Sequence, residues 1–357
     1  MRYFLELCLK SVEAAVKDME TEIIVVDNHS SDDSCAMVKC LFPDVKLLEN
    51  KLNFGFSKGN NLGANIAKGE YICILNPDTM ISEDTFKVLL NFAETKVNLG
   101  ILGCRLIDGK GAFLPESKRN IPKPKVALKK LLGFPKEYYA NQINDLGIGE
   151  VPILVGAFML MKKKIFDQVS GFDEDYFMYG EDIDLSYRIL KNGYTNFYNG
   201  TVTNIHFKGE STLRDRNYAK QFYRAMQVFY KKHFKKNVLF DFIVWIGIRM
   251  AYVFREKPKE ITANTERYIW VSKKIPDWFE VVSKKPIEVI SEINEVKENS
   301  EIVLDANMLS YKGIISCISN SKINNKAKFK ILPRNSNYII GSNSTISRGE
   351  VIRFEDN

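Results

Sequence analysis

Two acidic side chains each follow a short apolar run of the sequence, at the position where parallel α/β sheets bind their ligands. Asp27 ends the run EIIVVDN (22–28), and Asp78 ends YICILNPDT (71–79). A carboxylate in such a place can accept hydrogen bonds from a nucleotide, or bind Mg²⁺ or Mn²⁺ together with substrate phosphates. Each residue could instead be a helix N-cap or a turn residue.

A further group of acids lies in FMYGEDIDL (177–185), where Glu181, Asp182 and Asp184 fall within four residues beside aromatic side chains. Acids in the first turn of a helix commonly interact with its dipole. Three acids next to aromatic rings are less easily explained in that way, because a carboxyl group in such surroundings can have a raised pKa and act as a general base. We therefore treat this group as a candidate catalytic site.

One histidine has a comparable position. His206, in TNIHFKGEST (203–212), follows a predicted strand and precedes a turn that contains Gly and Ser. The chain has three histidines, so His206 belongs to no histidine cluster. A single histidine is more often structural, but one in this position can also bind a metal ion or a phosphate.

The elements that must position these residues follow from the apolar pattern. Residues 3–17 have apolar positions at helical spacing, and this segment lacks the long apolar run of a signal peptide. From 22 to 95, short apolar runs alternate with helical segments, which predicts a parallel sheet with helices on its faces. Residues 108–150 are rich in Pro, Lys and Gly, and we expect a long excursion or mobile loop there.

Composition narrows the class of protein. The chain has 357 residues, of which 45% are hydrophobic and 27% charged, as in ordinary globular proteins. Six cysteines form no Cys-x-x-Cys pair, which predicts a reduced, intracellular protein without a zinc knuckle. Of the net charge of +7, the segment 214–236 alone accounts for +7, with eight Lys or Arg and one Asp.

This basic segment is interleaved with aromatic residues and precedes the apolar run VLFDFIVWIGIRMAYVF (238–254), which contains one Asp and one Arg. A helix that spans a membrane needs about 20 mostly uncharged residues, so an amphipathic helix at an anionic membrane surface fits better. The alternative is a core helix packed on the rest of the protein. Nucleic acid is a poor alternative, because no known binding module accompanies the charge.

Three segments together identify a family. The segments are DNHSSDDS, NFGFSKGNNLGANIAKGEYICILNPDT and GAFMLMKKKIFDQVSGFDEDYFMYGEDIDLSYRILKNGY. In this order and spacing they closely resemble the family-2 glycosyltransferases of the GT-A fold, in particular the bacterial rhamnosyltransferase-like branch. The resemblance covers about residues 1–210 and implies a Rossmann-like mixed α/β sheet.

The resemblance also implies roles for particular residues. Asp182 would be the catalytic base, with Glu181 beside it. Asp78 and His206 would hold a divalent metal, Mn²⁺ or Mg²⁺. The other implied site residues bind the nucleotide and donor sugar (Asp27, Asn28, Asn53, Gly59, Asn60, Asn76 and Asp78) or shape the acceptor pocket (Gly156, Ala157 and Tyr179).

The implied reaction is an inverting transfer of a hexose or deoxyhexose, with rhamnose as the first choice. The donor would be a dTDP- or UDP-sugar, and the acceptor a cell-surface polysaccharide or a polyprenyl-diphosphate-linked glycan. Asp182 would deprotonate the acceptor hydroxyl, and Asp78 with the metal would stabilise the leaving diphosphate. We expect a cytoplasmic protein, peripheral on the inner face of the cell membrane.

The chain departs from the family at its start, because the usual opening strand is missing before MRYFLELCLKSV. We therefore expect EIIVVDN and YICILN to lack a neighbour in the sheet. This leaves a catalytically inactive binding or scaffold protein as the alternative function. A dinucleotide-dependent oxidoreductase fits less well, because the glycines at 55, 59 and 63 do not have the spacing of G-x-G-x-x-G.

The expected organisation has four segments. A catalytic GT-A domain occupies residues 1–212, and basic and apolar helices follow over 213–256. A linker is expected at 257–300. The final segment, 301–357, has the pattern of a small α/β module of unknown role.

Overall fold

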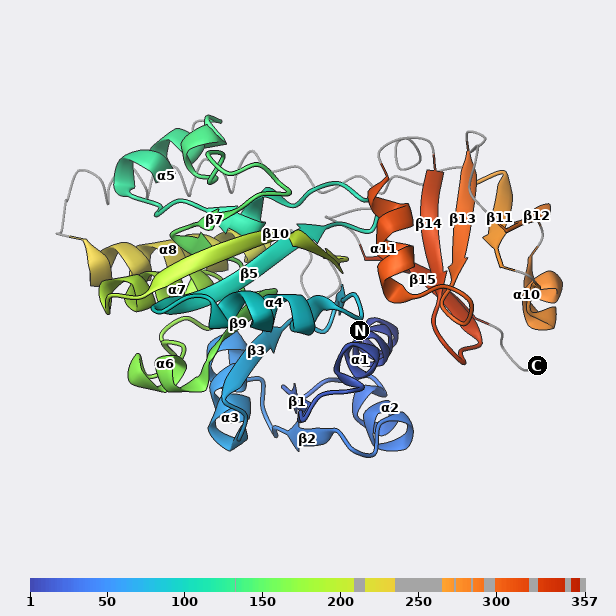
Figure 1. Cartoon of the computed structure of the whole chain (residues 1–357), viewed down its shortest axis with the longest axis horizontal. Helices are drawn as coiled ribbons and strands as arrows, with labels where there is room; N and C mark the ends of the chain where they lie inside the picture. The colour runs from blue at the N-terminus through green and yellow to red at the C-terminus, as the bar shows by residue number, and fades with distance from the viewer. Residues whose placement is uncertain are drawn as a thin grey trace.

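The computed structural model places an N-terminal part, residues 1–208 with a following helix, beside a C-terminal module of residues 265–353 (Figure 1). The structure describes residues 1–131, 133–208, 216–234, 265–272, 274–283, 285–291, 299–320, 327–343 and 348–353.

The N-terminal part begins with a helix and a small sheet. Its first elements are α1 (Arg2–Val16), β1 (Ile24–Asp27), α2 (Ser34–Leu41), β2 (Lys46–Glu49) and α3 (Gly55–Ile66). β1 pairs with β2 in parallel, with Asp27 opposite Glu49. The predicted alternation of strand and helix is thus confirmed over this stretch.

The main sheet of the N-terminal part has six strands. They are β3 (Tyr71–Leu75), β9 (Phe158–Lys162), β5 (Leu99–Ile107), β10 (Thr195–His206) and β4 (Thr79–Met80) in spatial order, with β7 (Ile148–Glu150) paired to β10. β5 and β10 are parallel, whereas β9 is antiparallel to both β3 and β5. The sheet is therefore mixed, as the resemblance implies, and the wholly parallel sheet predicted from the strand–helix order is wrong because β9 inserts between β3 and β5.

Helices cover both faces of this sheet. The helices added to α1 and α3 are α4 (Thr85–Glu94), α6 (Lys163–Gln168) and α7 (Glu181–Lys191). α1 and α4 bury Val12 and Leu89 in one core cluster, together with residues of β5 and β9. α3, α6 and α7 bury Ala64, Phe166 and Leu185 in another. The sheet is thus held rigidly between two apolar cores.

The β1–β2 sheet and the main sheet are not joined in the described part of the chain. β1 pairs with β2, β3 pairs with β9, and no strand of the described residues lies between β1 and β3. All four residues of β1 remain half-buried, although Ile24, Val25 and Val26 are of the apolar types typical of a central strand. This agrees with the expectation that the two runs lack a neighbour.

Residues 108–150 are folded rather than a featureless loop. They contain η1 (Pro115–Ser117), β6 (Lys118–Arg119), α5 (Pro124–Leu131) and η2 (Pro135–Glu137) in addition to β7. β6 pairs with β8 (Ile153–Leu154), which leads into β9. The expectation of a mobile excursion is wrong here, because this two-stranded ladder and backbone hydrogen bonds such as Asn120 N–H to the Tyr138 carbonyl tie the segment down.

The described residues of the C-terminal module form a six-stranded sheet and two helices. Its elements are β11 (Arg267–Val271), α10 (Asp277–Val282), β12 (Ile287–Ile290), β13 (Ser300–Asp305), α11 (Tyr311–Ser319), β14 (Ala327–Leu332), β15 (Tyr338–Gly341) and β16 (Glu350–Arg353). The order is β12-β11-β13-β14-β15-β16, and the first four strands are parallel. The α/β pattern expected over 301–357 is present, but β11 and β12 lie in the stretch where we expected a linker.

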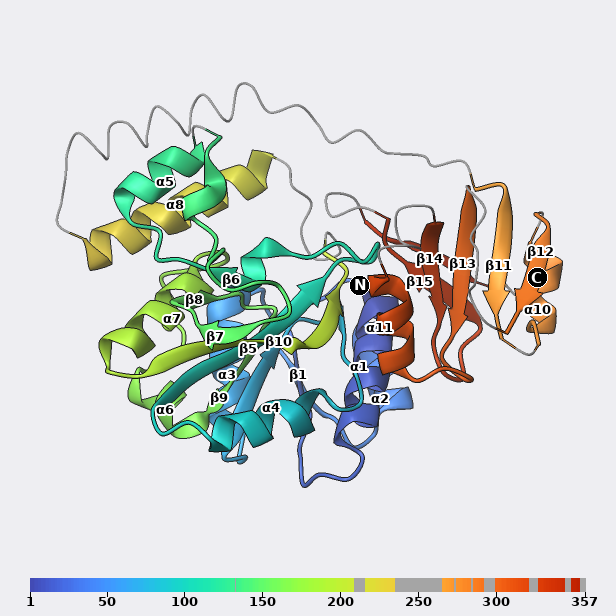
Figure 2. The ribbon, with the colours of Figure 1, turned by 45° about the horizontal axis from the view of Figure 1, so that its top comes forward.

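The C-terminal module shares a core with the N-terminal part. Figure 2 shows α1 and α11 side by side. Phe4 of α1 packs with Phe207 and belongs to the same cluster as Ile314 of α11 and Ile340 of β15. Continuous apolar packing of this kind, rather than a tether, fixes the module against the rest of the protein.

The basic segment begins with α8 (Arg216–His233), which packs through Ala225, Met226 and Phe229 against Ile183 of α7. This face of α8 therefore packs on the rest of the protein, which was the alternative to a helix at a membrane surface. Arg224 and Lys231 of the same helix are exposed. The apolar run 238–254 lies outside the described residues. Within those residues, no helix is long and apolar enough to cross a membrane.

Candidate active site

A cavity of about 1320 Å³ extends from the space between β1 and β3 to the start of α7. Every site residue that the resemblance implies lines it: Asp27, Asn28, Asn53, Gly59, Asn60, Asn76, Asp78, Gly156, Ala157, Tyr179, Glu181, Asp182 and His206. The fold thus brings together residues that are up to 179 positions apart in the sequence.

Asp78 and His206 meet where β3 and β10 end. His206 is the last residue of β10 and pairs with Thr79 of β4, while the Phe207 N–H donates to the Asp78 carbonyl. His206 Nε2 lies 3.2 Å from Asp78 Oδ1 and 3.3 Å from Asn76 Nδ2. Both Asp78 and His206 are buried. Sheet pairing therefore sets this contact, rather than loop conformation.

This end of the cavity fits a divalent cation. Asn76 Oδ1 and His206 Nδ1 are buried and have no hydrogen-bond partner among the described residues, and the buried Asp78 Oδ1 has only the His206 Nε2 contact. Buried polar atoms without partners are costly, and carboxylate and amide oxygens are ligands that Mg²⁺ and Mn²⁺ accept. The described residues contain no group of three acids, histidines or cysteines close enough to bind a metal ion. A cation here would need further ligands from substrate phosphates or water.

Asp182 lines the same cavity, from the first turn of α7. Its Oδ2 accepts hydrogen bonds from the Arg119 guanidinium at 2.6 Å and the Gly156 N–H at 3.0 Å. Gly180 has a φ of +78°, which lets the chain turn sharply into α7. The carboxylate is thus fixed by three elements, β6, the β8–β9 connection and α7.

Glu181, next to Asp182, has a different environment. Burial, followed by the negative charge of Asp182, raises the pKa of Glu181 to about 8. Its Oε2 is buried and has no hydrogen-bond partner among the described residues. Two adjacent carboxyl groups with unlike surroundings are a common arrangement for acid and base roles.

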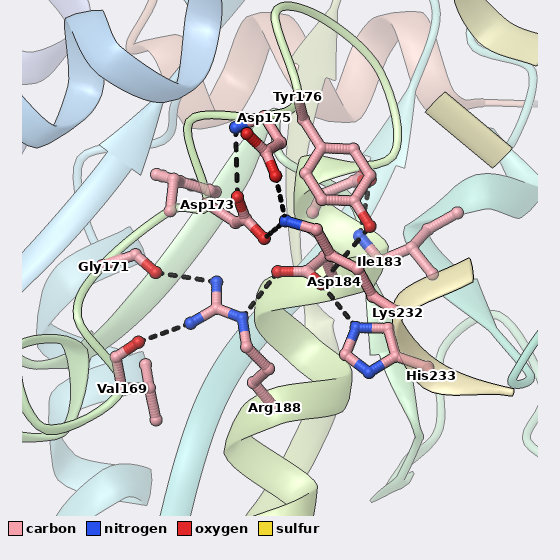
Figure 3. A network of polar contacts seen from close by, with 12 residues as sticks. Val169, Gly171, Asp173, Asp175, Tyr176, Ile183, Asp184, Arg188, Lys232 and His233 are labelled. Atoms are coloured by element: carbon pink, nitrogen blue, oxygen red, sulfur yellow. Dashed lines mark hydrogen bonds and ion pairs between the residues drawn. The ribbon is translucent and has the colours of Figure 1, made fainter. Parts of the chain in front are cut away.

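Asp184 is separated from these two acids and does not line the cavity. It accepts hydrogen bonds from Arg188 Nε and contacts His233 Nε2, each at 2.6 Å, as Figure 3 shows. Burial opposes ionisation of Asp184, but the hydrogen bond from His233 and the charge of Arg188 outweigh it and lower the pKa. The third acid of the cluster therefore fastens α8 to α7 and has a structural role.

The opposite end of the cavity lies at β1 and α3. Asn28 donates from Nδ2 to the Gly55 carbonyl at 2.8 Å, which links the end of β1 to the start of α3. A Cβ on Gly59 would lie 2.8 Å from Asn28 Nδ2, so glycine permits this close approach. The Asp27 carboxylate accepts hydrogen bonds from the Ser30 N–H, as a turn residue does.

The sequence did not reveal several residues that line the cavity, among them Arg119, Glu116, Tyr138 and Tyr139. All lie in the segment 108–150, which has no chemical motif. Arg119 is buried, and a buried guanidinium requires an acidic partner. The need for an acidic partner could predict the pairing of Arg119 with Asp182 only if the burial of Arg119 were known. The sequence alone does not show that the two-residue strand β6 is buried.

The chain is similar to known glycosyltransferases. Residues 3–170 match the family model "Glycosyl transferase family 2", and residues 149–208 match "N-terminal domain of galactosyltransferase". An N-acetylglucosaminyl-diphospho-decaprenol L-rhamnosyltransferase of Mycobacterium tuberculosis is 28% identical over 230 residues, which cover 59% of this chain and 74% of that protein. The rhamnosyltransferase WbbL of Escherichia coli is 29% identical over 168 residues, 43% of this chain and 61% of that protein.

A solved structure with a similar fold is that of a mannosyltransferase from Pyrobaculum calidifontis in complex with GDP-Man and Mn²⁺. It is 16% identical, has a TM-score of 0.46, and the match covers 71% of this chain and 67% of that one. A likeness this remote does not bear on ligands.

The mixed sheet and the family match define an α/β nucleotide-sugar transferase of the GT-A fold. Residues 3–170 of the chain match glycosyltransferase family 2, and the chain is similar to two rhamnosyltransferases.

Proposed function

We propose that this protein transfers a hexose or deoxyhexose, with rhamnose as the first choice, from a nucleotide-diphosphate donor to a glycan acceptor. The observation that carries the proposal is the convergence of Asp78, His206 and Asp182 on one cavity. The printed names of two relatives, both rhamnosyltransferases, support the choice of sugar.

Asp182 acts as the general base. It removes the proton of the acceptor hydroxyl while the hydroxyl oxygen forms a bond to the anomeric carbon and the bond from that carbon to the diphosphate breaks. Direct displacement inverts the anomeric configuration. Arg119 and the Gly156 N–H hold the Asp182 carboxylate in one orientation, so the base needs no rearrangement before reaction.

Asp78 and His206, with Asn76 beside them, would hold Mg²⁺ or Mn²⁺ at the diphosphate. The cation would neutralise the charge that develops on the leaving diphosphate. Asp27, Asn28, Asn53, Gly59 and Asn60 would bind the nucleotide at the β1 end of the cavity. Gly156, Ala157 and Tyr179 would shape the acceptor pocket.

The acceptor would be a polyprenyl-diphosphate-linked glycan or a growing polysaccharide. One relative is named for transfer to a diphospho-decaprenol carrier and another as a low-salt glycan biosynthesis hexosyltransferase. The exposed Arg224 and Lys231 of α8 would face an anionic membrane surface, each favouring binding by about 1 kcal/mol near the surface. The protein would then act at the inner face of the cell membrane.

The test is a transfer assay on the purified chain with dTDP-rhamnose and a polyprenyl-diphosphate-linked N-acetylglucosamine. UDP- and GDP-sugars and a reaction without acceptor serve as comparisons. We expect transfer that requires Mg²⁺ or Mn²⁺ and a product of inverted anomeric configuration, measured by NMR. Absence of transfer from every donor, in protein shown to be folded, would contradict the proposal.

The second candidate is an inactive binding or scaffold protein, and the unjoined sheets favour it. That candidate predicts glycan or nucleotide binding with no turnover of any donor. The same assay distinguishes the two functions, provided binding of each donor is measured in parallel.

A further inference from the structure

The C-terminal module reaches the same cavity as the proposed donor site. Arg348, between β15 and β16, lines the cavity together with His206 and Lys208. At the start of that connection the carbonyl oxygen of Ser342 lies 2.3 Å from the position that a Cβ of Gly109 would take. The strand end of the module is therefore packed tightly against a turn that neighbours the site.

A shared core fixes β15, the strand before Ser342. Tyr338 and Ile340 of β15 pack in one cluster with Ile107, Ile205 and Phe207. Ile205 and Phe207 flank His206 in the sequence, so β15 and the Asp78–His206 contact rest on the same apolar packing. β16 pairs with β15, with Glu350 opposite Gly341, so the strand that begins two residues after Arg348 is held by the same packing.

Lys208 and Arg348 are two positively charged residues that line the cavity. Lys208 forms an ion pair with Glu116. Arg348 is exposed, and no hydrogen bond or ion pair connects it to another residue in the described part of the chain. A guanidinium presents several N–H donors in a plane that match phosphate oxygens, and it does so in a cavity that also holds Asp78 and His206.

We propose that Arg348 binds the diphosphate of the nucleotide-sugar donor, so that the C-terminal module completes the donor site. This inference rests on the proposed transferase function. It gives the module a role in catalysis through substrate binding, because a charge that contacts the leaving diphosphate also stabilises it as the bond breaks.

The test compares the full chain with three variants, Arg348→Ala, Arg348→Lys and Lys274→Ala. Lys274 is an exposed lysine of the same module that does not line the cavity, so its loss matches the change in charge. Calorimetric titrations with dTDP, UDP and GDP identify the nucleotide that binds the wild type, and the matching monophosphate is the second probe. Thermal unfolding confirms that each variant is folded.

We expect Arg348→Ala to weaken diphosphate binding about tenfold or more, with Arg348→Lys in between and Lys274→Ala unchanged. Binding of the monophosphate should change much less, because Arg348 would contact the diphosphate rather than the nucleoside. If Arg348→Ala binds the diphosphate as tightly as Lys274→Ala does, the inference is wrong and the transferase function stands. If the wild type binds none of the nucleotides, both fail.

Discussion

The two ends of the cavity are built differently. At the polar end, Asp78, Asp182 and His206 are held by β10, by buried ion pairs and by a sheet packed on both faces. At the β1 end, the two-stranded sheet has half-buried residues and meets the rest of the protein through α1 and α3. The geometry that we propose for catalysis therefore depends on the six-stranded sheet, whereas the proposed nucleotide end depends on a less supported sheet.

This contrast leads to different expectations for substitutions at the two ends. Substitutions at the polar end should abolish sugar transfer or lower the free energy of unfolding by breaking a buried ion pair. Changes at the β1 end should affect local stability and leave the acids in place.

The largest effect is expected for Asp182→Asn. This substitution keeps the shape of the side chain but removes the base, so the transfer rate should fall by about 10²–10⁴-fold. The measurement is the rate at saturating donor, with circular dichroism to show that the variant is folded. Asp167→Asn, a change of the same kind at an exposed residue of α6, is the control. Activity within a few-fold of the wild type would exclude Asp182 as the base.

Arg119→Met should have the largest effect on stability. It leaves the buried Asp182 carboxylate without its cation, which costs about 3–5 kcal/mol of unfolding free energy. Urea unfolding measures this. The double variant with Asp182→Asn should be less destabilised than the sum of the single variants, because no unpaired charge remains. Additive costs would mean that the ion pair is not the cause.

Glu181 should make stability depend on pH. Its pKa is raised in the folded protein to about 8, above its ordinary value, so the folded state binds the proton more tightly than the unfolded state does. The stability that this provides is complete at low pH and is lost as pH rises toward 8. We therefore compare the free energy of unfolding of Glu181→Gln with that of the wild type, measured in urea. The difference should shift in favour of the variant by more than about 1 kcal/mol from pH 5 to pH 8. An equal difference at both pH values would contradict the raised pKa.

The smallest effect is expected at the β1 end, for Gly63→Ala. The new Cβ would lie 2.9 Å from Val26 Cγ2, so α3 and β1 must move apart slightly, at a cost of about 1 kcal/mol. Amide exchange in β1 and β2 should become faster, while exchange in β5 and β10 stays the same. Asn65→Ala, an exposed position of the same helix, is the control. Faster exchange throughout both sheets would contradict the independence of the two ends.

The sequence predicted the polar end well because each of its residues follows a strand or begins a helix. Asp78 ends an apolar run and Asp182 lies in the first turn of a strongly amphipathic helix, and such positions can be read from residue types. Arg119 and Arg348 could not be found, since each reaches the cavity through tertiary packing of segments without a motif. β11 and β12 were missed for a similar reason, because charged residues around them hide short apolar runs.

Metal-dependent nucleotide binding tests the proposed polar site most directly. The wild-type chain of 357 residues and its Asp78→Asn variant are each titrated with dTDP, UDP and GDP. Each titration is done with and without Mn²⁺. We expect the wild type to bind one nucleotide at least tenfold more tightly with Mn²⁺, and Asp78→Asn to lose that difference. Equal binding with and without Mn²⁺, or the same metal effect in both proteins, would contradict a metal–diphosphate site at Asp78.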